Sequence, residues 1–363
     1  MPHTFDFDLL VIGDANPDVV LGPLDAPLSF GQHEQLVDSG LLTLGGSAAI
    51  MACGAARLGL KVAFAGRVGD DDAGRFVRAA LHDRGVDTTA LRVDSTLATP
   101  LTVVLTRPDG DRAILTSPGT LTATGPEDVP ESLLGAARHV HAASYFLLPQ
   151  LAAALPELFG AARARGATTS LDTNDDPSGG WAQDALPATL AVTDFLLPNA
   201  QEATALSAAA RSRAALSNAT ASSAAASNAT ASSASSTSAA SSSAAPSSAA
   251  GTAPESIEAA AAALAAHGPH VIVKNGPDGA VAHDGSTVLR TDGIPAEPVD
   301  TVGAGDSFDA GFVAAHLRGL STADALAFAA ACGALSTRAH GGTPAQPTWD
   351  EAVAALSRNG KNL

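Results

Sequence analysis

Short apolar runs recur along the chain, and each of them ends at a glycine or at polar residues. Because these runs are nearly continuous in apolar residues, they are typical of parallel strands that are covered on both faces. Stretches of helical length lie between them. This alternation from residue 7 to residue 338 predicts a three-layer α/β/α fold with a central, mostly parallel sheet. The expected strands are 7–13, 61–66, 169–173, 195–198 and 271–274.

Residues 101–117 follow a different pattern, because apolar and polar residues alternate there on both sides of Asp109-Gly110. An Asp-Gly pair between two alternating segments is typical of a β-hairpin. Residues 19–44 carry only short apolar pieces that are broken by Gly and Pro. The sequence therefore predicts a hairpin over 101–117 that stands apart from the parallel strands.

Residues 207–250 form a low-complexity segment. Apart from Arg211, Arg213, Leu216 and Pro246, the segment contains only Ala, Ser, Thr and Asn. Such a composition has almost no apolar bulk and cannot cover a hydrophobic core. We therefore expect a disordered or weakly helical insertion in a single domain that spans 1–363.

Composition and charge limit the classes of partner. Aromatic residues are only 4% of the chain, so the core must be built from Ala, Val and Leu. The net charge of −17 argues against a nucleic acid or an acidic membrane as partner. No apolar run reaches the ~20 residues of a membrane-spanning helix, and the N-terminus lacks the pattern of a signal peptide, so a cytoplasmic location is expected. Small apolar residues surround Cys53 and Cys332, which favours buried free thiols.

A glycine-rich turn, Gly303-Ala304-Gly305-Asp306, leads directly into an apolar stretch of helical length. The two glycines allow a sharp turn and keep side chains away from a ligand. The unpaired N–H groups and the dipole of a helix N-terminus then form an anion site that suits a phosphoryl group. Asp306, beside this site, is placed to accept a proton from an attacking hydroxyl. The alternative is an ordinary loop with Asp306 as an N-cap.

Polar residues also follow the first expected strand. Asn16 and Asp18 lie just after it, where α/β sheets bind their ligands. A carboxylate can accept hydrogen bonds from two neighbouring hydroxyls of a sugar, although a simple polar turn is the alternative. A second turn, Gly45-Gly46, leads into a helix of small residues that ends at Gly59. Packing of that helix through its small residues explains the turn equally well.

Two further groups of residues have a functional and a structural interpretation. Asn199 and Glu202 have the spacing of a helix capping box, but the same turn can present Glu202 to a phosphate-bound metal. His139 and His141 share one face of an expected strand, yet no third metal ligand is near them in the sequence. Lys274 ends a strand and either adds a positive charge to a ligand site or faces solvent.

Several of these motifs together resemble the ribokinase-like (PfkB) carbohydrate kinase family. Residues 300–308 (Asp-Thr-Val-Gly-Ala-Gly-Asp-Ser-Phe) resemble its C-terminal signature, and 45–59 resemble its N-terminal signature. Gly13, Asn16 and Asp18 fit its Gly-x-x-Asn-x-Asp pattern. One residue departs from the family, because Ile50 stands where a sugar-binding Asn is usual. The acceptor is therefore expected to differ from ribose or to have an apolar part near Ile50.

The resemblance implies a role for each motif. Asp306 would be the catalytic base, and the turn Gly303, Ala304, Gly305 and Asp306 would form the anion hole. The acceptor would be bound by Asn16, Asp18, Gly45 and Gly46. The nucleotide side would comprise Asn199, Glu202, Lys274 and Gly276, with Glu202 holding Mg²⁺ through water. Asp300 and Val302 would bind a monovalent cation such as K⁺. Residues 15–44 and 97–118 would form a small β-sheet lid, through which a homodimer could form.

The expected activity is ATP-dependent phosphorylation of a hydroxyl group on a sugar or sugar-like molecule, with ATP and Mg²⁺ required. No Gly-x4-Gly-Lys-Ser/Thr motif is present, so the phosphates must be held differently from those in P-loop kinases. A nucleoside kinase on the same fold is one alternative. A non-catalytic regulator that binds a sugar or a nucleotide is another.

Overall fold

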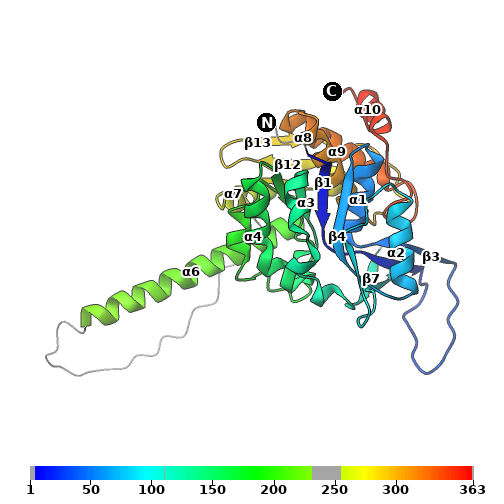
Figure 1. Ribbon diagram of the computed structural model, residues 1–363, viewed down its shortest axis with the longest axis horizontal. Coiled ribbons are helices and arrows are strands. Elements are labelled where there is room, and N and C mark those ends of the chain that lie inside the picture. Colours follow the sequence, from blue (N-terminus) through cyan, green and yellow to red (C-terminus); the bar gives the residue numbers. More distant parts are fainter. Residues whose placement is uncertain (1–4, 110, 231–254, 362–363) are drawn as a thin grey trace.

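The computed structural model describes residues 5–109, 111–230 and 255–361. Within these residues, nine strands form the central sheet in the order β13-β12-β11-β10-β9-β8-β1-β4-β5. Figure 1 labels β13, β12, β1 and β4 of this sheet. The seven strands from β11 to β5 are parallel, and only β12 and β13 are antiparallel to their neighbours. The strands are β1 (Phe7–Ile12), β4 (Val62–Gly69), β5 (Leu91–Asp94), β8 (Ala137–Ala142), β9 (Thr168–Leu171), β10 (Phe195–Leu196), β11 (His270–Lys274), β12 (Ala280–His283) and β13 (Val288–Thr291).

Helices cover both faces of this sheet, which confirms the predicted three layers (Figure 1). Strand β1 shows why its sequence is continuously apolar: Leu9 and Val11 join one core, while Leu10 and Ile12 join the other. The first core is completed by α1 (Ser47–Arg57), α2 (Asp72–His82), α8 (Ala304–Leu317), α9 (Thr322–Ser336) and α10 (Trp349–Arg358). The second is completed by α3 (Glu131–Ala136), α4 (Pro149–Ala164), α5 (Leu186–Leu190), α6 (Ala200–Thr230) and α7 (Ile257–Ala265).

Small side chains let the helices approach closely where aromatic residues are scarce. A Cβ atom added to Gly311 of α8 would lie 2.8 Å from Sγ of Cys332 on α9. Protein interiors are close-packed, so this contact requires glycine. Cys53 and Cys332 are both buried and free, as predicted.

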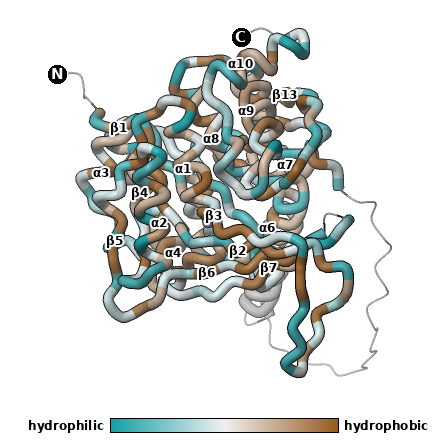
Figure 2. The backbone as a smooth tube through the Cα atoms, turned by 90° about the vertical axis from the view of Figure 1, so that its right-hand side faces the viewer, coloured by the Kyte–Doolittle hydropathy of each residue, from teal (hydrophilic) through white to brown (hydrophobic). Residues whose placement is uncertain are grey.

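A separate four-stranded sheet has the order β3-β2-β6-β7 (Figure 2). It is formed by β2 (Asn16–Gly22), β3 (Ser39–Gly45), β6 (Leu101–Thr106) and β7 (Arg112–Ser117). Strands β6 and β7 pair antiparallel from Leu101 with Ser117 to Thr106 with Arg112, which confirms the predicted hairpin. Asn16 and Asp18 lie on β2, next to the point where the chain leaves β1.

The low-complexity segment begins inside α6, which projects from the body of the protein (Figure 1). The first turns of α6 contribute Ala203 and Leu206 to the core. Ion pairs of Arg211 with Glu255 and of Arg213 with Asp184 hold the next turns. Residues 231–254, which carry the rest of the expected insertion, lie outside the described residues. Among the described residues, no helix has the length and apolar character needed to cross a bilayer.

Candidate active site

The Gly303 turn and the first turn of α8 form the expected anion site. Gly303 precedes the helix in a left-handed conformation with φ of 72°, which glycine adopts without strain. Because Gly303 has no side chain, it cannot cap the helix, and the first amide groups of α8 remain suited to bind an anion. Asp306 is the third residue of the helix, so the interpretation of Asp306 as its N-cap is wrong.

Ile50 packs against this turn. A Cβ atom on Gly303 would lie 2.9 Å from Cγ2 of Ile50 and 2.6 Å from Cα of Gly342. A Cβ atom on Gly342 would lie 2.6 Å from Cδ1 of Ile50. The side chain of Ile50 therefore fills the space between the two glycines. Since Ile50 is only 3% exposed, little of it is left for an acceptor to contact, which does not support the expected apolar part of the acceptor at this position.

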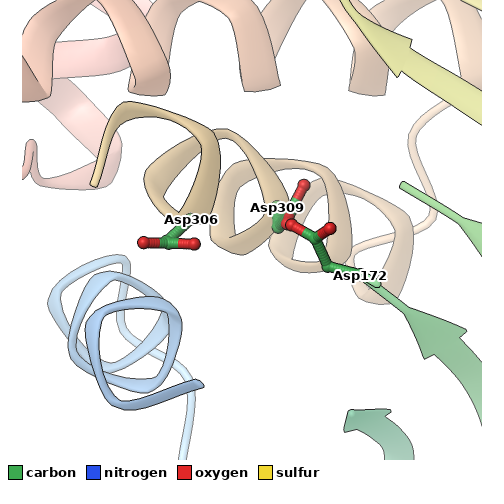
Figure 3. Close-up of side chains that lie close together, drawn as sticks. All are labelled: Asp172, Asp306 and Asp309. Atoms are coloured by element: carbon green, nitrogen blue, oxygen red, sulfur yellow. The ribbon is translucent and has the colours of Figure 1, made fainter. Parts of the chain in front are cut away.

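Asp306 is buried among charged groups. Figure 3 shows its carboxylate on α8, with Asp309 further along the same helix and Asp172 beside Asp309. Carboxylate oxygens of these three residues lie within 4.8 Å of one another. Burial, together with the charge of Asp172, raises the pKa of Asp306 to about 8, although Lys274 acts in the opposite direction. A group with such a pKa can exchange a proton near neutral pH.

The acceptor residues are held at the junction of β1, β2 and β3. The side-chain amide of Asn16 donates to Oδ1 of Asp18 at 2.7 Å and to Oγ1 of Thr102 at 3.2 Å. A Cβ atom on Gly45 would lie 2.0 Å from Oδ1 of Asp18, so glycine at 45 is required by the position of this carboxylate. Gly46, with φ of 88°, precedes α1 and approaches the backbone of Asp14.

Asp14 is a site residue that we did not single out from the sequence. Its carboxylate accepts hydrogen bonds from the amides of Ser47 and Ala48, at 3.2 Å and 3.0 Å, and so caps α1. Its charge helps to raise the pKa of Asp18, which burial brings to about 7, and that of Asp306. Both carboxylates are therefore within electrostatic range of Asp14. The signal in the sequence was an acid directly after a buried strand.

Residues of the nucleotide side combine structural and candidate functional roles. The amide of Asn199 donates to Oε2 of Glu202 at 2.8 Å, and the amide of Glu202 donates to Oδ1 of Asn199 at 2.9 Å, which is the predicted capping box. Burial and the charge of Asp172 raise the pKa of Glu202 to about 7. Gly276 has a positive φ of 55°, and no atom lies within 4 Å of the place of its missing Cβ.

Lys274 does not face solvent. Its ammonium group donates to Oδ2 of Asp172 at 2.6 Å and to Asp309 at 3.1 Å, and its side chain is only 10% exposed. The alternative of a solvent-facing lysine is thus wrong. The carboxylates of Asp172, Asp306 and Asp309 are close enough together to hold a metal ion. The ammonium group of Lys274 is paired with two of them, Asp172 and Asp309, and supplies the positive charge that a metal ion would bring.

The two histidines of β8 form hydrogen bonds. His139 contacts the hydroxyls of Thr168 and Ser170 through its two ring nitrogens, both at 2.7 Å, and His141 contacts Ser170 at 2.7 Å. Burial lowers the pKa of His141 to about 4, so the ring stays neutral. Neither histidine belongs to a group of metal-ligating side chains within the described residues.

Asp300 joins the signature turn to the segment after α9. Its carboxylate accepts hydrogen bonds from the amide of Val302 at 3.0 Å and from the amide of Gly341 at 2.9 Å. These bonds fix the entry to the Gly303 turn. Carboxylate and carbonyl oxygens at such a turn are also the ligands that hard cations prefer.

Comparison with known proteins identifies the family. Residues 6–233 and 238–349 match the model of the pfkB family carbohydrate kinases. The ATP-dependent ribose-1-phosphate kinase of Halopiger xanaduensis is 30% identical over 349 residues, which cover 96% of this chain and 98% of the relative. The structure of Arabidopsis thaliana ribokinase complexed with ribose and ATP matches with a TM-score of 0.74 and 24% identity, over 97% of this chain and 99% of the other. A putative ribokinase II from E. coli, in complex with ATP and Mg²⁺, matches with a TM-score of 0.72, 22% identity and the same coverage.

The solved structures establish the ribokinase fold for this chain, and the family model covers nearly the whole of it. The chain belongs to the pfkB family of carbohydrate kinases, enzymes that transfer a phosphoryl group from ATP to a sugar or sugar-like molecule.

Proposed function

We propose that Asp306 is the general base that activates a sugar hydroxyl for attack on the γ-phosphorus of ATP. The observation that carries this proposal is the burial of Asp306 on the first turn of α8, beside the Gly303 turn and within interaction range of Asp14. A base must be close to both the acceptor and the site of developing negative charge. The position of Asp306 on the first turn of α8 supports the second condition, and the effect of Asp14 on both Asp306 and Asp18 supports the first.

In this mechanism Asn16, Asp18, Gly45 and Gly46 hold the acceptor. The acceptor hydroxyl loses its proton to Asp306 while its oxygen forms a bond to the γ-phosphorus. The bond between that phosphorus and the bridging oxygen breaks, and ADP leaves with the electron pair. The amides from Gly303 to Asp306 stabilise the charge on the transferring group, which is usually the larger part of catalysis. The four-stranded sheet acts as a lid that excludes water as a competing acceptor.

On the nucleotide side, Gly276 and Asn199 would border ATP, and Glu202 would hold Mg²⁺ through water. Mg²⁺ supplies charge neutralisation for the phosphates when it is bound. The residues fit such an ion, because Glu202 is buried beside Asp172 and Asp175, and its pKa is raised by burial and by their charges. A nearby cation would favour the ionised form of Glu202. Asp300 and the carbonyl of Val302 are the corresponding candidates for a monovalent cation such as K⁺.

The lid also offers a surface for a second copy of the chain. Large apolar side chains are exposed on it, at Phe30, Leu36, Leu42, Ile114 and Leu115. Exposed apolar patches on a sheet favour association. We therefore propose a homodimer that forms through the lid. We also propose a cytoplasmic enzyme, and the net charge of −17 supports the absence of a nucleic acid or a membrane as partner.

A screen for ADP release over sugars, sugar phosphates and nucleosides tests the function. We expect ATP turnover that depends on a polyhydroxylated acceptor, because Asn16 and Asp18 are suited to bind hydroxyl groups. The named activity of the Halopiger relative makes ribose 1-phosphate an important member of the panel. Turnover with nucleosides alone would establish the nucleoside kinase alternative. Tight binding of acceptor and ATP without turnover would favour the non-catalytic regulator and contradict the proposal.

Truncation of Ile50 tests its contact with the Gly303 turn. We expect Ile50→Ala to lower kcat more than it changes the KM of the acceptor, because the cavity would leave the anion-hole turn unsupported. A loss of about 2–5 kcal/mol in the free energy of unfolding is expected as well. Ile50→Val keeps most of the contact and serves as the matched control. A large change in acceptor KM with an unchanged kcat would instead place Ile50 against the substrate.

A further inference from the structure

A buried ion triad of Lys274, Asp172 and Asp309 joins three elements behind the proposed base. Asp172 directly follows β9, Lys274 is the last residue of β11, and Asp309 lies on α8. Asp306 and Asp309 are three residues apart, so they share one side of the helix. Figure 3 shows the carboxylates of Asp172 and Asp309 facing each other next to Asp306.

The contacts of the triad are close, and its three side chains are largely buried. Nζ of Lys274 lies 2.6 Å from Oδ2 of Asp172, and 3.2 Å and 3.1 Å from the two oxygens of Asp309. A Cβ atom added to Gly305 would lie 3.6 Å from the same Nζ. The ammonium group therefore contacts two carboxylates and also lies against the backbone of the anion-hole turn.

The two acids of the triad differ in how readily they ionise. Burial opposes ionisation of both, but Lys274 and the hydrogen bond with Asp309 hold the pKa of Asp172 below its usual value. Burial and the charge of Asp172 raise the pKa of Asp309, despite the attraction of Lys274. Asp172 is therefore the acid of the triad that ionises more readily, and it forms the shorter contact with Lys274. Such mutual satisfaction is what buried ionic groups require.

We propose that the Lys274–Asp172 ion pair is a positioning device for the catalytic turn, and that it sets the charge environment in which Asp306 gains and loses its proton. This inference rests on the proposed role of Asp306 as the base. It assigns to Lys274 a role that differs from direct contact with ATP, because its ammonium group is already committed to Asp172 and Asp309. Lys274 and Asp172 are thus positioning residues that act through Asp306.

The two members of the pair act on Asp306 in opposite directions. Asp172 disfavours the ionised form of Asp306, whereas Lys274 favours it. The other groups that face Asp306 are Asp14 from the end of β1, Asp309 one turn along α8, and the hydroxyl of Ser47 at the start of α1. Removing one charge of the pair should therefore shift the proton affinity of Asp306 with a sign that depends on the charge removed.

The test is the pH dependence of kcat/KM for Asp172→Asn and Lys274→Met. We expect the acidic limb of the profile to move to lower pH by about 1–3 units in Asp172→Asn and to higher pH in Lys274→Met, the usual range for a neighbouring charge. Lys361→Met is the matched control and should keep the wild-type limb, because it removes a lysine that donates to Thr291 on β13, two strands away from Lys274, and not to the carboxylates of the triad.

Lys274→Met leaves a buried carboxylate without its partner and can fail to fold for that reason. The double variant Lys274→Met/Asp172→Asn removes both charges and should fold, with its limb between those of the two single variants. A limb that stays at the wild-type pH in Asp172→Asn would overturn the inference, because in this variant only the charge that raises the pKa of Asp306 has been removed. Wild-type activity that persists in Asp306→Asn would instead overturn the proposed function, so the two failures are distinguishable.

Discussion

Asp306→Asn is expected to lower kcat by about 10²–10⁴-fold, which is the contribution of a general base. Asparagine has nearly the same shape but cannot accept the proton of the acceptor hydroxyl. The amides of the Gly303 turn and the binding residues remain in place, so residual turnover and an almost unchanged acceptor KM are expected. Steady-state kinetics with the acceptor found in the ADP-release screen measure both quantities.

The fold of this variant is expected to be at least as stable as the wild type. Burial and the charge of Asp172 raise the pKa of Asp306 to about 8 in the folded protein, from 3.8. The stabilising contribution of the protonated form is therefore complete below pH 3.8 and is lost as the pH rises through 8. Asparagine does not ionise, so the advantage of the variant in melting temperature should grow between these values. Full activity, or loss of the native fold, would contradict the assignment.

Gly303→Ala is expected to lower kcat by about 10²–10³-fold, comparable to the loss of an oxyanion-hole donor. Alanine is strained at a φ of 72°, and its Cβ would lie 2.6 Å from Cα of Gly342 and 2.9 Å from Cγ2 of Ile50. Because one of these contacts is with backbone, the turn itself must move and the amides would leave the transferring phosphoryl group. A loss of about 1–3 kcal/mol in the free energy of unfolding is expected from the strain.

Gly85→Ala is the matched control for this variant. Gly85 has a similar φ of 79°, but nothing lies within 4 Å of the place of its Cβ. The control therefore has the backbone strain of a positive φ without the clash, and it is distant from the proposed anion hole. We expect a modest loss of stability with unchanged kcat. Equal kcat values for the Gly303 and Gly85 variants would show that the geometry of the Gly303 turn does not matter for turnover.

Local patterns were sufficient to predict most of the architecture. The strand periodicity, the Asp109-Gly110 hairpin and the capping box of Asn199 with Glu202 all depend on residues that are close in sequence. Strand ends were less accurate, because pairing partners decide them: β4 extends to Gly69 beside β5, whereas β10 comprises only Phe195 and Leu196.

The contacts that the sequence did not reveal join distant residues. The buried Lys274 is paired with Asp172, which comes 102 residues earlier in the chain. The two residues lie at the carboxyl ends of the inner strands β9 and β11. Ile50 packs between Gly303 and Gly342, which lie on segments far along the chain. Motif spacing identifies the chemistry of a residue, but it gives no distance between separate motifs. The roles of Lys274, Ile50 and Asp14 therefore followed only from the folded structure.

The most direct test of Asp306 as the base is a crystal structure of the enzyme with its acceptor and a non-hydrolysable ATP analogue. We expect the reacting hydroxyl oxygen to lie about 3 Å from a carboxylate oxygen of Asp306, within hydrogen-bond reach, and in line with the γ-phosphorus. The phosphoryl oxygens should contact the amides of the Gly303 turn. A bound acceptor whose reacting hydroxyl is beyond hydrogen-bond reach of Asp306, with another side chain in its place, would contradict the proposed mechanism.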